Sequence, residues 1–186
     1  MSRPSLRTLR RHEITVAFAR VLARHGQAGA TIAAIAEEAG VAPGLVHHNF
    51  ADKQDLYSAL LEQLIAGFRH RIDARATTRK EDPLEAYADA ALALDESSDT
   101  IAARAWMAVF AEALSDPLLF EKMRRLLDAE VLSLERRAKG RLTTRNASAV
   151  LAYIVGSFVF GAFAPRKAAG FAAPGAKKLL RALSTN

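Results

Sequence analysis

The chain has 186 residues, of which 26 are Lys or Arg and 20 are Asp or Glu, so its net charge is +6 and its pI is near 10. Hydrophobic residues make up 51% of the chain and charged residues 25%, which excludes disorder throughout and suits one or two domains with a substantial core. The lack of cysteine excludes disulfides and cysteine-ligated zinc, while the basic charge favours a polyanionic partner such as nucleic acid.

Two segments bear on where the protein works. Residues 1–13 are charged and lack the apolar stretch of a signal peptide, so we expect a cytoplasmic protein. Residues 149–164, AVLAYIVGSFVFGAFA, are apolar, but they fall short of the roughly 20 residues that cross a bilayer. They also contain glycine and run into Pro165, so we expect a buried helix and no membrane contact.

The N-terminal third predicts three short or medium helices, because its apolar residues recur at helical spacing. The first runs from about Leu6 and stops near Gly26. Thr31 is placed to cap the second helix, and Gly40 lies just past its end. Pro43 suits the first turn of the third helix, because a proline there gives up no hydrogen bond.

A long fourth helix is expected to follow Asp52, with Asp55 as the second member of a capping box. It runs to about Ile72, and RATTRKED, residues 75–82, comes after it. The remaining pattern predicts helices from Pro83, over 100–114, over 117–139 and over 149–164, a loop over 165–175, and a last helix over 176–183. The sequence therefore predicts an all-α fold of about nine helices.

The second and third helices fit a helix-turn-helix, a motif that places its second helix in the major groove of DNA. Ala36 is small enough for two helices to cross closely, and Gly40 permits the positive φ that the turn needs. Val46 fills the space between the helices. The alternative is an ordinary helical hairpin that matches this spacing by chance.

Residues 30–61, ATIAAIAEEAGVAPGLVHHNFADKQDLYSALL, resemble the DNA-binding domain of the tetracycline-repressor (TetR) family of bacterial regulators. The match is carried by Thr31, Ile32, Ile35, Ala36, Ala39, Gly40, Val41, Gly44, Val46, Phe50, Lys53 and Leu56. Ala42, His47 and Asn49 depart from the residues usual in the family, which leaves the fold secure and the operator open.

Residues 103–131 are similar to the ligand-binding domain of the betaine-regulator subgroup, through the order Trp106, Phe110, Glu112, Pro117. Relatives of that kind often carry a triplet like DGL in the penultimate long helix, where this chain reads YIVGSFVFG. Choline is therefore not carried over as the ligand.

The resemblance implies two domains: a helix-turn-helix DNA-binding domain over residues 1–52 and an effector-binding and dimerisation domain over 53–186. The helix from residue 53 links them. It also implies a homodimeric regulator, most often a repressor, that a small-molecule effector releases from double-stranded DNA. One alternative is a DNA-binding regulator whose C-terminal domain only dimerises or binds a partner protein. Another is a helical ligand carrier with no role on DNA.

Twelve residues are expected at the DNA. Four arginines of the N-terminal arm are placed to reach phosphate or the minor groove, although a solvated arm is as good a reading for the first of them. Two residues at helix N-termini suit phosphates, and the recognition helix offers mostly methyl contact with thymine and one guanine donor, His48. These residues are Arg3, Arg7, Arg10, Arg11, Thr31, Pro43, Gly44, Leu45, His47, His48, Asn49 and Lys53, with His47 or Asn49 expected at phosphate.

The last two helices predict a two-fold dimer, because the segment around 147–163 is apolar almost all round. Ala152 and Gly156 would let a partner helix approach closely, and three leucines of the last helix, Leu179, Leu180 and Leu183, would complete a four-helix contact. A dimer implies a near-palindromic operator. The alternative is a core within one chain.

A pocket for a small, largely apolar molecule is expected in the second domain. Trp106 and Phe110 share one helix face, and Tyr153 and Phe158 come from the helix expected to pack against it. Glu112 would anchor a cation if it points inward. The alternative is that these rings are simply core.

Other chemistry has little support in the sequence. There is no Ser-His-Asp order, HExxH motif or glycine-rich phosphate loop, and the histidines lack partners at metal-binding spacing. We therefore expect no enzyme activity, no metal and no cofactor.

Overall fold

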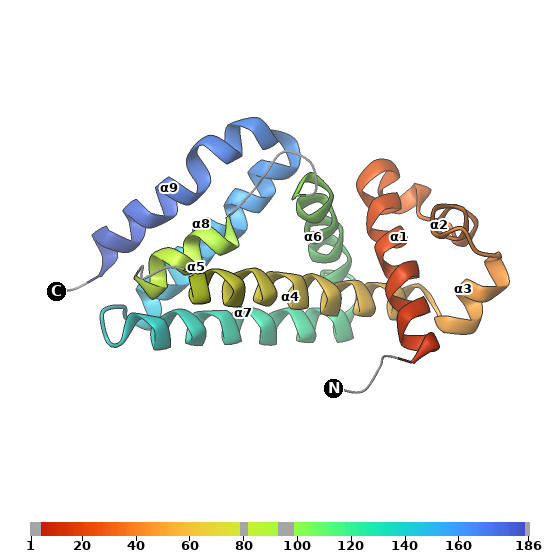
Figure 1. Ribbon diagram of the computed structural model, residues 1–186, viewed down its shortest axis with the longest axis horizontal. Helices are drawn as coiled ribbons and strands as arrows, with labels where there is room; N and C mark the ends of the chain where they lie inside the picture. The colour runs from red at the N-terminus through yellow and green to blue at the C-terminus, as the bar shows by residue number, and fades with distance from the viewer. Residues whose placement is uncertain (1–4, 79–81, 93–98, 185–186) are drawn as a thin grey trace.

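The computed structural model describes residues 5–78, 82–92 and 99–184. Within those ranges every regular element is an α-helix, and nine are present, which confirms the predicted all-α fold (Figure 1). They are α1 (Leu6–Gly29), α2 (Ile32–Ala39), α3 (Pro43–Asn49), α4 (Lys53–Thr78), α5 (Pro83–Ala91), α6 (Asp99–Ala113), α7 (Pro117–Ala138), α8 (Thr144–Phe163) and α9 (Pro165–Leu183).

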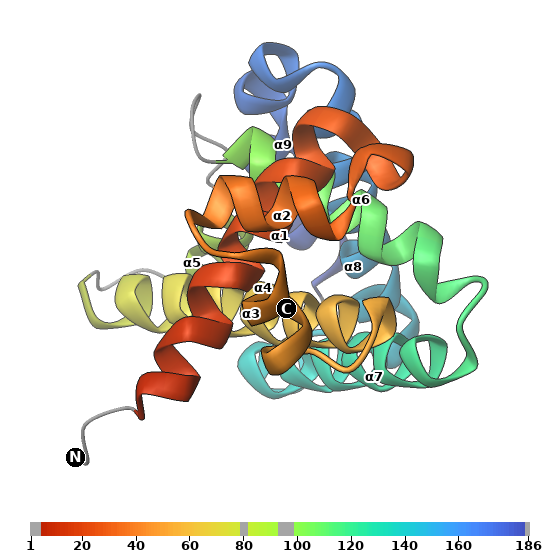
Figure 2. The same ribbon diagram turned by 90° about the vertical axis from the view of Figure 1, so that its right-hand side faces the viewer.

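The helices form two groups that α4 connects. Helices α1 to α3 gather at one end of the molecule, and α5, α8 and α9 lie toward the other end, near the C-terminus (Figure 1). The long helices α4 and α7 lie side by side, and α6 stands between α1 and the rest. Seen from the end, α2 and α3 are outermost, in front of α6 and α8 (Figure 2). The three-helix end is therefore free to meet a partner.

The helix ends follow the residues that predicted them. Thr31 Oγ1 accepts from the Ala34 N–H at 3.2 Å, and Gly40 ends α2 with φ 64° and ψ 36°. Asp52 Oδ1 accepts from the Asp55 N–H at 2.8 Å, and the Asp55 carboxylate reaches back to the N–H before Asp52. The predicted starts of the first four helices are confirmed.

The expected end of the first helix needs a small correction. Gly26 leaves helical geometry with φ 66° and ψ −171°, as its sequence position suggested, but a further turn follows and α1 ends at Gly29. The helix is therefore kinked at Gly26 and not ended there, because a glycine with positive φ bends the backbone at little cost.

The loop expected over residues 165–175 is wrong, because α9 already begins at Pro165. Pro165 occupies the first turn, where its missing N–H costs nothing. Pro174 lies inside the helix and removes one hydrogen bond, but the carbonyl left over is that of Gly170, which is exposed to water. Tyr153 of α8 packs so closely on Gly175 that a methyl group there would overlap its hydroxyl. Packing against α8 therefore stabilises a helix in a segment whose prolines and glycines predict a loop.

Two hydrophobic clusters fill the molecule. One lies among α4, α5, α7, α8 and α9, takes in Ala103 of α6, and includes Phe68, Tyr87, Leu134 and Ile154. The other begins in α1 to α3 and continues through the first half of α4 into α6 and the start of α7. It joins Phe18 of α1 to Trp106 of α6. The N-terminal helices therefore share a core with the helix expected to carry the pocket.

Helix α8 is the one helix, among the described residues, that is long and apolar enough to cross a membrane by length and composition. Its most apolar stretch is 44% buried inside this fold. The core helix of a soluble protein passes the same test, so these properties do not place the chain in a membrane.

Candidate DNA-binding surface and effector cavity

The helix-turn-helix is built as its spacing requires. Ala36 and Val46 are buried where α2 and α3 cross, and Gly40 takes the left-handed conformation between them. Phe50 closes the same core at the end of α3. The buried residues fix the angle of α3, and its other side faces outward (Figure 2).

The exposed side of α3 carries the residues available to a ligand. Pro43, Gly44, His47 and His48 are exposed, and Leu45 is half-buried. This surface is short, mostly apolar and carries two imidazoles. It suits methyl and shape readout more than the bidentate hydrogen bonds of Arg or Gln.

Asn49 does not belong to this surface. Its side chain is buried and its Nδ2 donates to the carbonyl of Leu45 at 2.8 Å. The expectation that Asn49 touches phosphate is therefore wrong, since the amide is already satisfied inside the domain. Of the two candidates for that contact, His47 is the exposed one.

Arg11 also has a structural place. Its guanidinium forms an ion pair with Asp55, with 2.9 Å between Nη2 and Oδ1, and lies 4.2 Å from the centroid of the Phe50 ring. It also donates to the backbone carbonyl of Asn49. The hydrogen bond from Arg11 lowers the pKa of Asp55 below its usual value. This corrects the expectation that Arg11 reaches DNA, because its charge is used within the domain.

The other arginines of the arm are differently placed. Arg10 is exposed and pairs with Glu13 at 2.8 Å, and Arg7 is exposed. Arg3 lies outside the described residues. Arg7 is thus the arginine of this arm that the described contacts leave open to phosphate.

Thr31 and Lys53 lie at the N-termini of α2 and α4. The Thr31 hydroxyl caps its own helix and remains exposed. Lys53 is exposed, with its Nζ donating to the backbone carbonyl of Gln27 at 3.3 Å. That contact is with an exposed backbone group, so the ammonium can exchange it for a phosphate.

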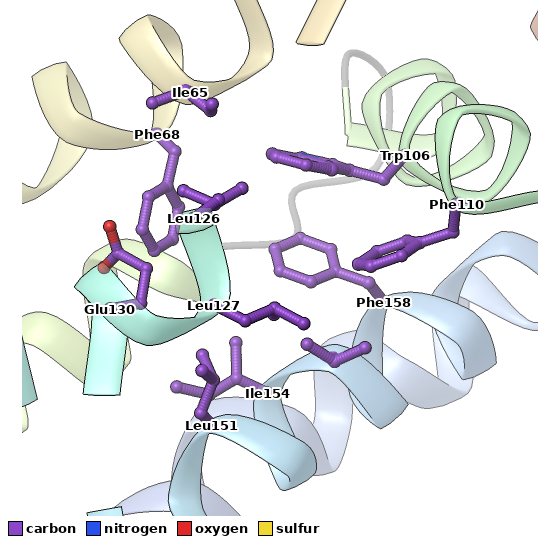
Figure 3. A pocket seen from close by; sticks show the side chains of 11 residues that line it. Ile65, Phe68, Trp106, Phe110, Leu126, Leu127, Glu130, Leu151, Ile154 and Phe158 are labelled. Carbon is purple, nitrogen blue, oxygen red and sulfur yellow. The ribbon is translucent and has the colours of Figure 1, made fainter. Parts of the chain in front are cut away.

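An apolar cavity lies between α4, α6, α7 and α8 (Figure 3). The space that it leaves for a water-sized sphere is about 40 Å³, roughly room for one water. Trp106 and Phe110 lie on one wall with ring centroids 6.0 Å apart. Its lining consists of Ile65, Phe68, Trp106, Phe110, Leu126, Leu127, Glu130, Leu151, Ile154, Val155 and Phe158.

Three of the five residues expected at the pocket line this cavity, namely Trp106, Phe110 and Phe158. Tyr153 does not, because it faces α9, where its hydroxyl donates to the carbonyl of Phe171 at 3.4 Å. Glu112 does not either, because its Oε2 accepts from Gln27 Nε2 at 2.6 Å and so faces α1. Both expectations were wrong. Each residue lies on a helix that lines the cavity, but its side chain points to a different helix, α9 for Tyr153 and α1 for Glu112.

The carboxylate at the cavity is Glu130, which was not expected. It is buried, and its Oε2 accepts a hydrogen bond from the Tyr87 hydroxyl at 2.9 Å. Burial raises the pKa of Tyr87, and the charge of Glu130 raises it further. Its position continues the buried stripe of α7 through Leu126 and Leu134, so an acid at apolar spacing was the signal available in the sequence.

The face expected at the dimer interface is largely uncovered. Ala152 and Gly156 are exposed on α8, and Phe160 and Phe163 continue that face. Leu179 and Leu183 are half-buried. Leu180 is only 2% exposed, so its expected place at an interface is corrected: it belongs to the core of its own chain.

An exposed helix-turn-helix joined by shared core to a helical domain with its own cavity defines a DNA-binding transcriptional regulator. Residues 14–60 match the family described as bacterial regulatory proteins, tetR family. The chain is 34% identical, over 182 residues, to the HTH-type transcriptional regulator BetI of Brucella anthropi, covering 92% of this chain and 93% of that protein. The chain belongs to the tetR family of bacterial regulators and is related to BetI.

Solved structures agree in fold. A transcriptional regulator from Rhodococcus sp. Rha1 superposes with a TM-score of 0.82 at 23% identity, covering 93% of this chain and 95% of that one. The multidrug binding protein EbrR, complexed with imidazole, superposes with a TM-score of 0.71 at 22% identity, covering 99% and 97%. At these identities the likeness concerns the fold alone.

Proposed function

We propose that the protein is a homodimeric repressor that a small-molecule effector releases from a near-palindromic operator in the cytoplasm. Its family membership makes it a DNA-binding regulator. Repression, dimerisation and release by an effector are the steps that the proposal adds.

The observation that carries the proposal is the position of α6. This helix supplies Trp106 and Phe110 to the cavity wall and also holds α1 of the DNA-binding end. Arg104 of α6 donates through Nη1 to the carbonyl of Ala23 at 2.9 Å. A ligand that moves α6 would therefore move α1, and with it α3.

The size of the cavity sets a condition on the effector. Ligand sites usually hold about 300–1,000 Å³, far more than the space left here. The effector must therefore push side chains apart, and that displacement is a source of differential affinity between a DNA-bound and a released state. The fold of EbrR, a multidrug binding protein, supports the idea that such a domain admits small molecules.

The uncovered face of α8 supports the dimer. Exposed Phe160 and Phe163, together with the small residues Ala152 and Gly156, form an apolar surface that a second copy would cover. Two DNA-binding ends related by a two-fold axis would then read two half-sites about one helical turn apart, or slightly more. The contacts with DNA would be made by the exposed residues of α3, including His47, together with Arg7, Thr31 and Lys53.

A second candidate is a DNA-binding regulator whose C-terminal domain only dimerises or binds a partner protein. The small free space in the cavity favours it, because a cavity of about 40 Å³ is also what an ordinary core leaves behind.

One experiment separates the two candidates. DNA from upstream of the chain's own gene and its neighbours is retarded on gels by ligand-free protein, and candidate metabolites are then added. Trp106 is the only tryptophan, so its fluorescence reports the cavity. We expect an effector to change Trp106 emission and release DNA with the same midpoint. Fluorescence that never responds to any ligand that releases DNA would place the effector site elsewhere, and DNA that is never retarded would contradict the proposed function as a whole.

A further inference from the structure

A groove between α4 and α7 opens beside the apolar cavity. Leu61, Ile65 and Leu126 form its floor, and charged side chains of both helices form its walls. The space for a water-sized sphere is about 460 Å³, against about 40 Å³ in the cavity. The two helices run side by side at this point (Figure 1). The groove is therefore large enough for a ligand group, whereas the cavity as it stands is not.

Only two side chains belong to both spaces, Ile65 and Leu126. Leu126 is nearly buried and Ile65 is half-buried, and both project from neighbouring helices toward the cavity (Figure 3). Neither side chain carries a polar group, so moving one aside breaks no hydrogen bond. A slender apolar chain lying in the groove could thus enter the cavity between them.

The walls of the groove are cationic. Arg69, Lys122 and Arg125 face one carboxylate, Glu62. Lys122 pairs with Glu62 at 3.4 Å, and Arg125 pairs with Glu121 outside the groove at 2.9 Å. Arg69 is exposed and, over the described ranges, makes no ion pair. A smaller recess that shares Arg69 continues along α7 to Arg136 and Arg137, and it also contains the carboxylates of Asp73 and Glu130. The groove thus offers an anion one unpaired guanidinium among several cations.

The inner cavity presents no cationic side chain that could bind an anion. Its one acid, Glu130, turns its carboxylate to the Tyr87 hydroxyl, away from Trp106 and Phe158 (Figure 3). The remaining lining is aliphatic or aromatic. A ligand that fills both spaces therefore needs an apolar part inside and a negative part outside.

We propose that the α4–α7 groove is the head-group half of the effector site and that the effector is an amphiphilic organic anion. Its carboxylate or phosphate binds Arg69, and its alkyl or aromatic tail passes between Ile65 and Leu126 to Trp106. This rests on the proposed function and adds the class of ligand. The proposal explains why a nearly closed cavity lies beside an open, cationic groove: the tail needs room only when the ligand is present.

The test uses the full chain and the emission of Trp106, with four ten-carbon probes kept below their micelle concentrations or solubility limits. Decanoate and decyl phosphate carry the proposed charge, decanol carries none, and decyltrimethylammonium carries the opposite one. We expect saturable changes with the two anions, and at least tenfold weaker binding of the cation. The carboxylate and phosphate arms tell which head group fits better.

Two variants locate the head and the tail. Arg69→Gln should weaken decanoate about tenfold, the loss of one charge-assisted contact at an exposed site, and leave decanol unchanged. Arg145→Gln, an exposed arginine at the start of α8, is the matched control and should change neither. Ile65→Phe should block the passage and reduce the Trp106 response to every probe, with circular dichroism reporting whether the variant is folded.

Equal or tighter binding of the cation, or an Arg69→Gln variant that binds decanoate as the parent does, would overturn the proposal. Neither result touches the proposed function, because release of DNA by some other ligand is measured separately on gels. An anion that binds in an Arg69-dependent way but never releases DNA would contradict the proposed release by an effector and still support the groove as an anion site, so the two failures can be told apart.

Discussion

Arg11 of α1 and Asp55 of α4 form an ion pair, 2.9 Å from Nη2 to Oδ1, at the base of the helix-turn-helix. The same guanidinium covers the Phe50 ring and donates to the carbonyl of Asn49, the last residue of α3. One side chain therefore ties the C-terminal end of α3 and the first turn of α4 to the first helix.

We expect Arg11→Ala to lower the free energy of unfolding by about 1 kcal/mol. Both partners are about one-third exposed, so solvent screens the ion pair, and the contact over Phe50 adds a similar small amount. Urea unfolding measures the change. Arg7→Ala is the control, since Arg7 is exposed on the same helix and should lose DNA affinity and no stability. If the two variants were equally stable, the contacts of Arg11 would not contribute to the stability of the fold.

The pair also predicts a pH dependence. The hydrogen bond from Arg11 is the largest influence on Asp55 and lowers its pKa from the usual 3.8. A carboxyl whose pKa is lowered by folding stabilises the folded chain above its unfolded pKa and loses that contribution as pH falls through the folded pKa. The stability difference between the parent and Asp55→Asn should therefore be constant near neutral pH and shrink below about pH 4. A difference that grows in acid would contradict this assignment.

Lys53→Ala should weaken binding to all DNA sequences alike. The ammonium lies at the start of α4 and donates to the exposed backbone carbonyl of Gln27. Loss of one phosphate contact per half-site should reduce the slope of log affinity against log salt by roughly one unit per half-site. Lys167→Ala, exposed at the far end of the chain on α9, serves as control. A change in which sequence is preferred would assign Lys53 to base readout instead.

Gly156→Arg should yield monomers that bind operator DNA poorly. A Cβ atom at Gly156 meets nothing within 4 Å in its own chain, so we expect the substitution to leave the protomer folded and to place a charge on the exposed face of α8. Analytical ultracentrifugation reports the change in mass, and circular dichroism the fold. A dimer of unchanged stability would rule out this face as the interface.

Two glycines of α9 should differ in how replacement by alanine changes the stability of the chain. Gly170→Ala meets open space and should gain up to about 1 kcal/mol from helix propensity. Gly175→Ala would overlap Tyr153 and must move that ring, so the propensity gain is offset and the variant should be the less stable of the two by about 1 kcal/mol or more. Thermal melts of both variants side by side decide the point. Equal gains would mean that Tyr153 moves freely.

Most helix starts could be predicted from the sequence because their causes are local; α8 is an exception, since it begins at Thr144 and was expected only from residue 149. Thr31 and Asp52 accept hydrogen bonds from residues three positions on, and Pro83 and Pro117 occupy first turns, so neighbours in sequence decide each start. The start of α9 was missed for the opposite reason. Residues 165–175 contain two prolines and two glycines, and a contact with α8 overrides them.

The cavity shows the same division. Trp106 and Phe110 are four residues apart on one helix, so their shared face followed from spacing. Glu130 can lie buried in the cavity wall because the hydroxyl of Tyr87, 43 residues earlier, donates a hydrogen bond to its carboxylate. Glu112 faces α1 because Gln27, 85 residues earlier, meets it there. Tertiary packing decides which face of a helix contacts which neighbour. Helical periodicity shows which residues share a face, but it does not show what that face contacts.

The hydrophobic cluster that joins Phe18 to Trp106 constrains how this regulator can diverge. Under the proposed function, exposed positions of α3 such as Pro43 and His48 can change to suit a new operator without disturbing the core. A change of ligand through Trp106 has less freedom, because Trp106 belongs to the same hydrophobic cluster as the buried residues of α1. Descendants of this chain should therefore acquire new DNA sites by single substitutions and new ligands only by coordinated ones.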